Sequence, residues 1–222
     1  MTLSLTTQRT AFTDRMDAAV NLVDETHPVK GRSPLARDAR GLAIVVAFGA
    51  YENLFRSTTR ALLEEALSLR VSNRRLQPGF RLFALAGTAK SMRAASANRL
   101  YAQTLPKLLT AAASGSRKCT IDVNAFPDDG SFMKSSQIEL WCRIFAVPHP
   151  GTFLGATWTS VDAIVGQRNA IAHGDQTPGE IGRMYAEGDI RSLLGAWRAG
   201  WLGLVNAVEV LGSSRDFYRS SR

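Results

Sequence analysis

The sequence has no long apolar run. Although 45% of its 222 residues are hydrophobic, the longest charge-free apolar stretch is Leu42 to Tyr51. That is far short of the roughly 20 residues that a membrane-spanning helix requires. The segment from Met1 to Asp14 lacks a basic patch followed by an apolar run, so we expect no signal peptide. The composition favours a soluble, cytoplasmic protein that is large enough to bury a sizeable core.

Cysteine is scarce, and the patterns of familiar cofactor sites are missing. Cys119 and Cys142 have no metal-ligand spacing. A single disulfide is one alternative, but two reduced thiols in packed positions are the better interpretation. The sequence also has no Gly-rich phosphate loop, no zinc spacing and no acidic metal cluster. We therefore expect no metal and no cofactor.

Acidic residues are missing from one long stretch. No Asp or Glu occurs from Ala66 to Ile121, which holds ten of the 27 basic residues. The rest of the chain has 17 basic and 19 acidic residues, so the net charge of +8 is concentrated in this stretch. Arginine outnumbers lysine 22 to 5, and its planar fork of donors suits phosphate. This predicts RNA as a partner; the alternative is a solvated basic surface.

The basic stretch is also the least regular part of the sequence. We predict that residues of about 71–130 form an irregular insertion or decorated connection between core helices. Within it, Ala95 to Ala113 is expected to be a helix with a kink or break at Pro106, and Lys118 to Val123 a short strand. We assign RNA binding to the first six cations of the acid-free stretch: Arg70, Arg74, Arg75, Arg81, Lys90 and Arg93.

Apolar residues at steps of three and four indicate helices over most of the remaining chain. The expected helices are Thr7 to Asp24, Leu35 to Leu69, Ser136 to Val147, Thr159 to Ala172 and Asp189 to Leu211. Gly41 and Gly49 weaken the second of these slightly or let another helix approach closely. No segment shows strong strand alternation. The predicted fold class is all-α, a helical bundle in a single domain over residues 1–222, with its core at about 7–70 and 133–212.

The helix expected from Thr159 to Ala172 has recognisable ends. Thr159 and Asp162 are spaced like a capping box. Gly174 is placed to end the helix as a left-handed residue. A turn is expected next, at residues 177–179, because a proline is followed there by a glycine.

Three polar residues near the end of this helix are candidates for a site. Arg168 falls on the apolar stripe that contains Val161 and Ile164, and a charge there must be paired or must face a groove or partner. Asn169 and His173 are four residues apart and share a neighbouring face. The three side chains of Arg168, Asn169 and His173 can therefore converge on one ligand.

These residue types suit cleavage of RNA without a metal. RNA carries its own nucleophile, the 2′-hydroxyl, so an enzyme has to move protons and stabilise charge on the phosphate. Histidine can move protons near neutral pH, and arginine can hold the phosphate with a bidentate fork. At a helix C-terminus, the dipole favours the imidazolium form of His173 and hence proton donation. The alternative from the residues alone is a buried, paired Arg168 and a His173 that caps the helix.

The segment from Arg168 to Gly174, Arg-Asn-Ala-Ile-Ala-His-Gly, resembles the Arg-x4–6-His motif of HEPN domains. The upstream helix at Ala50 to Phe55 and the long helix after the motif fit as well. The chain is most similar to the RiboL-PSP-HEPN branch, over residues of roughly 40–70 and 133–212. The resemblance does not extend to the basic stretch between them.

The resemblance implies an endoribonuclease whose centre forms at a homodimer interface, in a toxin–antitoxin or anti-phage defence setting. Arg168 and His173 would then carry catalysis, with Asn169 as the supporting polar residue, and an antitoxin or regulatory protein would be a further partner. One alternative is a non-catalytic RNA-binding or regulatory HEPN module, because some relatives are thought to bind without cutting. Another is a purely structural helical dimer.

Two further features have competing interpretations. Glu52 lies near the apolar stripe of the long helix, where it is either a supporting acid that orients Arg168 or another arginine, or an acid at the stripe edge. Trp197 and Trp201 are four residues apart on the last helix, where they either form a base-stacking platform or, as we favour, pack in the core.

Overall fold

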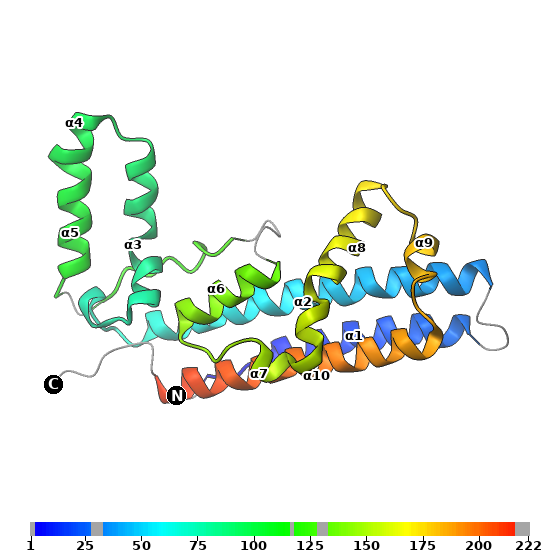
Figure 1. The fold of residues 1–222 in the computed structure, drawn as a ribbon. Helices are drawn as coiled ribbons and strands as arrows, with labels where there is room; N and C mark the ends of the chain where they lie inside the picture. The colour runs from blue at the N-terminus through cyan, green and yellow to red at the C-terminus, as the bar shows by residue number, and fades with distance from the viewer. Residues whose placement is uncertain (1–2, 28–32, 116–117, 128–132, 216–222) are drawn as a thin grey trace.

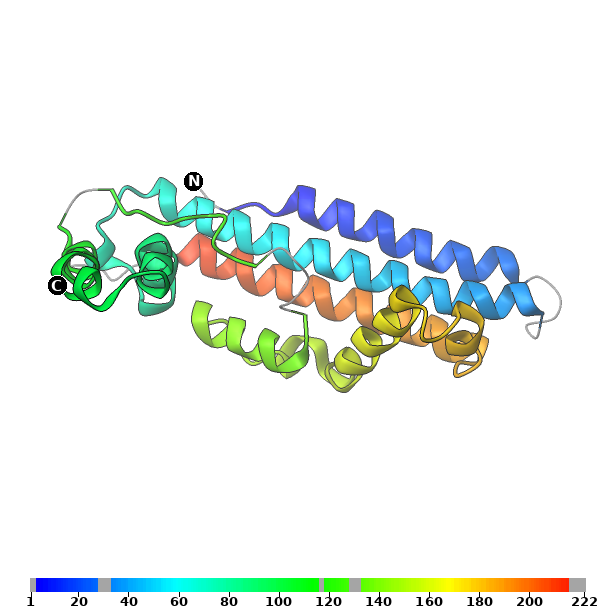
Figure 2. The ribbon, with the colours of Figure 1, turned by 90° about the horizontal axis from the view of Figure 1, so that it is seen from above.

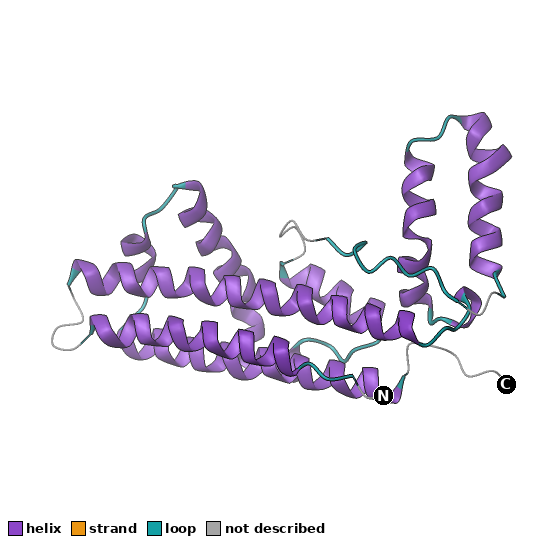
Figure 3. Cartoon of the chain, turned by 180° about the vertical axis from the view of Figure 1, so that it is seen from behind, coloured by secondary structure: helices purple, strands orange, loops and turns teal. Residues whose placement is uncertain are grey.

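The structure is a computed structural model that describes residues 3–27, 33–115, 118–127 and 133–215. Its regular elements in these ranges are all helical, which confirms the all-α fold (Figure 3). In chain order they are α1 (Thr6–Thr26), α2 (Pro34–Ser68), η1 (Asn73–Arg75), α3 (Pro78–Arg93), α4 (Ala97–Arg99), η2 (Leu100–Thr104), α5 (Leu105–Ala113), α6 (Ser135–Phe145), α7 (Gly151–Leu154), η3 (Gly155–Ser160), α8 (Val161–His173), α9 (Pro178–Gly182) and α10 (Glu187–Ser214). None of the described helices is long and apolar enough to cross a membrane.

The three longest helices, α1, α2 and α10, run side by side along the length of the molecule (Figures 1 and 2). The Ser33 hydroxyl caps α2 by accepting a hydrogen bond from the Ala36 amide, and Pro34 occupies the first turn, where its missing N–H costs nothing. The buried residues of α1 follow the predicted periodicity: Phe12, Met16, Ala19 and Val23. Periodic apolar faces therefore assemble the bundle.

Aromatic rings fill the centre of this bundle. Tyr51 of α2 stacks on Trp201 of α10 with ring centroids 4.1 Å apart, and it meets Trp197 edge-on. The Tyr51 hydroxyl donates to the Met133 carbonyl at 3.0 Å, and Trp197 Nε1 donates to the Ala47 carbonyl at 3.2 Å. Burial raises the pKa of Tyr51 well above its usual value. Both tryptophans are fully buried, so they pack in the core and are not a base-stacking platform.

Helix α9 packs against α2 backbone to backbone. A Cβ on Gly41 would lie 2.0 Å from the Pro178 carbonyl oxygen, and one on Gly182 would lie 1.9 Å from the Arg37 carbonyl oxygen. Gly41 thus allows the close approach that its position suggested. The predicted turn at residues 177–179 is instead the start of α9, because Thr177 caps this helix in a reciprocal arrangement with Glu180.

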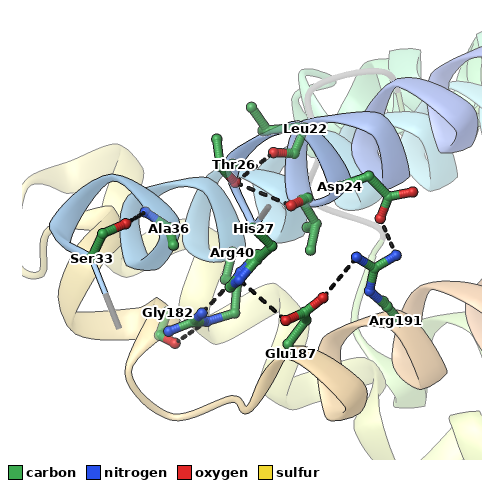
Figure 4. A network of polar contacts seen from close by, with 11 residues as sticks. Leu22, Asp24, Thr26, His27, Ser33, Ala36, Arg40, Gly182, Glu187 and Arg191 are labelled. Carbon is green, nitrogen blue, oxygen red and sulfur yellow. Dashed lines mark hydrogen bonds and ion pairs between the residues drawn. The ribbon is translucent and has the colours of Figure 1, made fainter. Parts of the chain in front are cut away.

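A polar network fixes the same end of the bundle (Figure 4). Buried Arg40 donates from Nε to the Gly182 carbonyl at 2.9 Å, and its terminal nitrogen lies 3.0 Å from His27 Nε2. His27 Nδ1 lies 3.3 Å from Oε2 of Glu187, and the other carboxylate oxygen of Glu187, Oε1, accepts from Arg191 at 2.8 Å. Burial lowers the pKa of Arg40. The network joins α1, α2, α9 and α10, and it gives His27 a structural role that the sequence did not reveal.

The basic stretch is more regular than predicted. It forms a helical hairpin, with α3 on one side and α4, η2 and α5 on the other, and this hairpin projects from the bundle (Figure 1). We call residues 78–113 the basic arm. Pro78 is tolerated because it occupies the first turn of α3. Gly79 is tolerated because it lies against the Ile144 backbone, where a Cβ would approach the carbonyl oxygen to 1.6 Å.

Pro106 changes the helical register in the second half of the arm but does not break the helix, because it lies in the first turn of α5 and the chain is helical from residue 97 to 113. Proline has no amide hydrogen, so the Ala102 carbonyl cannot form the usual helical bond to residue 106. The chain forms the π-helical turn η2 directly before it, in which the Leu105 amide bonds to the Leu100 carbonyl. A helix therefore covers most of the expected range from Ala95 to Ala113, with a local change of register.

The strand predicted from Lys118 to Val123 is wrong. Its amides bond to a side chain and to a helix instead of to a neighbouring strand: the Thr120 amide donates to Asn73 Oδ1 at 2.9 Å, and the Asp122 amide donates to the Phe83 carbonyl at 3.1 Å. The segment also buries Cys119. The local sequence specifies neither of these hydrogen-bond partners, so the residue types of the segment alone could not exclude a strand.

Candidate functional site

Helix α8 carries the candidate motif, and it projects from the bundle on the same side as the basic arm (Figure 1). Its first half packs against the core through Val161, Ile164 and Val165, all of which are buried. Ala172 is exposed, so the predicted apolar stripe does not continue to the end of the helix. The motif therefore lies where α8 leaves the core.

The predicted capping box at the start of α8 is wrong. Thr159 lies in the 3-10 helix η3, and its hydroxyl donates to the Ala156 carbonyl at 2.9 Å. Asp162 instead accepts from the Ser135 amide at 2.8 Å and from the Ser135 hydroxyl at 2.5 Å. These hydrogen bonds lower the pKa of Asp162. The residue thus joins the start of α8 to the start of α6.

The other end of α8 is as predicted. Gly174 has a φ of 78°, in the left-handed region that favours glycine. Its amide bonds to the Ile171 carbonyl at 3.2 Å, and the Gln176 amide returns to the Ala170 carbonyl at 3.1 Å. This ending turns the chain back towards α9 directly after His173.

Arg168 is half-buried and held in place without an acidic partner. The central carbon of its guanidinium lies 4.6 Å from the ring centroid of Phe48 on α2. One terminal nitrogen donates to Asn169 Oδ1 at 2.9 Å. No carboxylate in the described parts of the chain pairs with this guanidinium. The arrangement orients a cation by a ring and an amide while leaving its charge available to an anion.

His173 is exposed at the last position of α8 and makes no side-chain hydrogen bond within the described residues. The structure thus brings Arg168 and Asn169 into contact and leaves His173 one turn away from Asn169, on the open end of the helix. An imidazole in this position is accessible to substrate or to a second chain.

Glu52 does not contact Arg168. It is half-buried on α2 and lines a shallow surface hollow together with Arg15, Asn53 and Arg56. Arg168 is oriented by Phe48 and Asn169, and not by an acidic side chain. The place of Glu52 in a hollow with Arg15 and Arg56 leaves open both remaining interpretations, an acid that supports another arginine and an acid at the stripe edge.

Two residues that the sequence did not single out fix the orientation of the motif. The Tyr185 hydroxyl donates to Gln167 Oε1 at 2.8 Å, and Gln167 Nε2 lies 3.8 Å from the Met184 sulfur. Gln167 directly precedes Arg168, and Tyr185 belongs to the connection between α9 and α10. No periodicity or motif links positions 18 apart, so this contact could not have been predicted.

The six cations assigned to RNA binding have different surroundings. Arg81 has a structural role, because its guanidinium donates to the carbonyls of Asn73, Arg74 and Leu76 at 2.8–3.2 Å and thereby holds η1. Arg75 is half-buried. The other four are exposed, two before the arm and two on the last turn of α3: Arg70, Arg74, Lys90 and Arg93.

Within the described residues, no group of three or more His, Cys, Asp or Glu side chains could hold a metal ion. Both cysteines are free and buried. Comparisons with protein-family models, with curated proteins and with solved structures gave no match. The likeness to HEPN domains therefore stays a prediction from the motif at Arg168 to Gly174.

Proposed function

We propose that the protein is a metal-independent endoribonuclease in which Arg168, Asn169 and His173 act on the RNA backbone. The observation that carries this proposal is the setting of Arg168. Its guanidinium is oriented by Phe48 and Asn169, and no carboxylate neutralises it in the described structure. An oriented, uncompensated guanidinium beside an exposed histidine suits a phosphodiester better than any neutral substrate.

The proposed reaction is an attack by the ribose 2′-hydroxyl on the adjacent phosphorus. A bond forms between the 2′-oxygen and phosphorus while the bond from phosphorus to the 5′-oxygen breaks. A base removes the 2′-hydroxyl proton, and an acid protonates the departing 5′-oxygen. The products carry a 2′,3′-cyclic phosphate and a 5′-hydroxyl. DNA has no 2′-hydroxyl and is therefore not a substrate.

A homodimer would supply both the acid and the base. One histidine cannot donate one proton and accept another in the same step, and each chain has one histidine in the motif. We propose that the His173 side chains of two copies face one composite site, an arrangement that a two-fold interface through projecting α8 allows. A strictly monomeric mass in light scattering at micromolar concentrations would exclude this arrangement.

The decisive experiment measures cleavage of bulk RNA by the wild type and by His173→Ala, with and without a chelator. We expect chelator-resistant cleavage and a loss of about 10²–10⁴-fold in rate in the variant, as is typical of acid–base groups. Arg168→Lys should fail as well, because an ammonium cannot replace a bidentate fork. His149→Ala is the matched control, since His149 is exposed and held in a distant loop by the Gly151 amide.

A wild-type protein that leaves every RNA intact, or that cuts only with added Mg²⁺, would refute this mechanism. The non-catalytic RNA-binding module would then take its place. One observation favours that alternative, namely that no described side chain orients the His173 imidazole. On the resemblance alone we also propose a toxin or anti-phage setting with an antitoxin or regulatory partner. Growth arrest on expression, lost in His173→Ala, would test it.

A further inference from the structure

The basic arm contains a polar groove between its two halves. The groove has a volume of about 200 Å³. The side chains and backbone that line it come from α3 on one wall and from α4, η2 and α5 on the other: Gly87, Thr88, Ser91, Arg99, Gln103, Thr104 and Lys107. Hydroxyls, an amide and two cations therefore line one hollow. The Ser91 and Thr104 hydroxyls already donate to the carbonyls of Gly87 and Arg99, at 3.0 and 3.3 Å. The donors left for a ligand are the Thr88 hydroxyl, the Gln103 amide and the two cations.

The electrostatics of this groove are one-sided. Arg99 and Lys107 are exposed, and neither forms an ion pair in the described structure. The whole arm lies inside the acid-free stretch from Ala66 to Ile121. A concave surface that has cations and hydroxyls but no carboxylate among its lining residues attracts phosphate groups.

The π-helical turn η2 shapes one wall of the groove. Gln103 and Thr104 belong to this turn, and Lys107 comes directly after Pro106 in the first turn of α5. Such turns occur frequently at functional sites because they change the direction in which side chains point. Thr104 is 6% exposed, and its hydroxyl bonds back to the Arg99 carbonyl at 3.3 Å, so this wall is a defined surface.

The groove and the α8 motif lie on the same side of the bundle. Both the basic arm and α8 rise from one face of α2, near different points along its length (Figures 1 and 2). Arg168 contacts α2 at Phe48, whereas the arm follows the end of α2 at Ser68. These 20 residues of α2 span about 30 Å along the helix axis, so a strand that reaches from the arm to the motif needs at least roughly nine stacked nucleotides.

We propose that the groove of the basic arm binds backbone phosphates of single-stranded RNA and that the same strand reaches the motif on α8. This inference rests on the proposed function, because it identifies the substrate class of that site. A single strand is required since in-line attack by the 2′-hydroxyl needs a backbone that can rotate, which a rigid duplex prevents. Arg99 and Lys107 would carry the arm contact, outside the six cations assigned from the sequence.

Binding can be separated from cleavage by measuring it in the His173→Ala background. The probe is a fluorescent single-stranded RNA of about 20 nucleotides, which exceeds the estimated span. Arg99→Gln combined with Lys107→Gln should weaken binding roughly tenfold and reduce the salt slope of log K by about 1.4, since each lost contact on a single strand contributes about 0.7. Arg9→Gln with Arg198→Gln removes the same charge from α1 and α10, where both arginines are paired with acids, and should change binding far less.

RNA length provides the second measurement, made with the catalytically intact chain. The groove variant should raise KM on the RNA of about 20 nucleotides and leave cleavage of an RNA of about four nucleotides unchanged, because the short strand cannot span both sites. Equal losses on both lengths would indicate a damaged motif and would overturn the inference.

The outcomes distinguish this inference from the proposed function. If the groove variant binds RNA like the wild type, the groove assignment is wrong while cleavage can still stand. If the wild type cleaves no RNA but the groove variant binds RNA more weakly than the wild type, the nuclease proposal fails and the groove remains a binding site. Equal or tighter binding of a duplex of the same length would overturn the choice of single-stranded RNA.

Discussion

The bundle and the basic arm use the same residue types in different ways. Several cations of the bundle are paired with acids, among them Arg9 with Glu209 and Arg198 with Asp17, whereas the arm has no acid in its sequence. Helix α10 buries a full face of apolar residues, but α5 buries none of its residues. Charge and apolar surface are locally compensated in the bundle and left available in the arm. The first region maintains the fold, and the second is suited to contact a partner.

The largest expected effect contrasts an aromatic residue of each region. Trp201→Ala should lower the free energy of unfolding by about 4 kcal/mol, because it removes a fully buried ring that stacks on Tyr51. Tyr101→Ala should change it by less than about 0.5 kcal/mol, since Tyr101 of the arm is 72% exposed. Urea denaturation measures both. Similar losses in the two variants would break the distinction between the regions.

The next prediction compares two glycines of α2. Gly41→Ala should destabilise the protein by about 2–3 kcal/mol, because the new methyl would collide with the Pro178 carbonyl and push α9 away. Gly49→Ala should stabilise it by about 0.5–1 kcal/mol, since nothing lies within 4 Å of that methyl and alanine favours helix. Thermal unfolding of the two variants should therefore shift in opposite directions. Shifts of the same sign would mean that α9 does not depend on this contact.

A smaller difference is expected between the rates at which thiol reagents label the two buried cysteines. Burial raises the pKa of both thiols, that of Cys142 to about 12, so both should react slowly with thiol reagents in the native protein. Both cysteines belong to the buried core, but Cys119 lies in the segment that returns from the arm, whereas Cys142 lies in α6. Local opening of the arm should therefore expose Cys119 first, with labelling roughly tenfold faster. Cys119→Ser should remove the faster phase, and a single phase in the wild type would indicate that the regions open together.

The bundle could be predicted from sequence because its information is local. The apolar periodicity of α1, α2 and α10 locates helices to within a few residues, and Gly174 ends α8 where its type requires. The same reasoning marked Pro106 as an irregular point, which the structure accommodates by a π-helical turn and not by a break. It underestimated the helical content of the arm because α3 contains Gly79 and Gly87, which are unfavourable in helices. At Gly79 this cost is offset by a close backbone contact with α6.

The residues of the candidate site come from a sequence motif and their role stays a prediction, whereas the contacts that hold them could not be predicted. Arg168, Asn169 and His173 follow from one motif on one helix. The residues that hold Arg168 and its neighbour do not, because Phe48 and Tyr185 come from other parts of the chain. Glu52 was proposed for that task on proximity to an apolar stripe, which does not specify a partner. Long-range pairing is the information that periodicity and spacing lack.

The smallest predicted effect concerns the junction between the bundle and α8. The hydrogen bonds from Ser135 lower the folded-state pKa of Asp162 below its unfolded value, so the ionised carboxylate stabilises the folded chain. That contribution is complete above the unfolded pKa of about 3.9 and is lost as the pH falls through the lower folded value. Because Asp162 is exposed, we expect less than about 1 kcal/mol. Asp162→Asn should therefore be slightly less stable than the wild type at neutral pH, and the two proteins should converge in acid. Glu65→Gln, at a half-buried position of α2 whose carboxylate has no hydrogen bond among the described residues, is a control that should show no such convergence. A difference between wild type and Asp162→Asn that persists or grows in acid would show that the carboxylate charge does not hold α8 to α6.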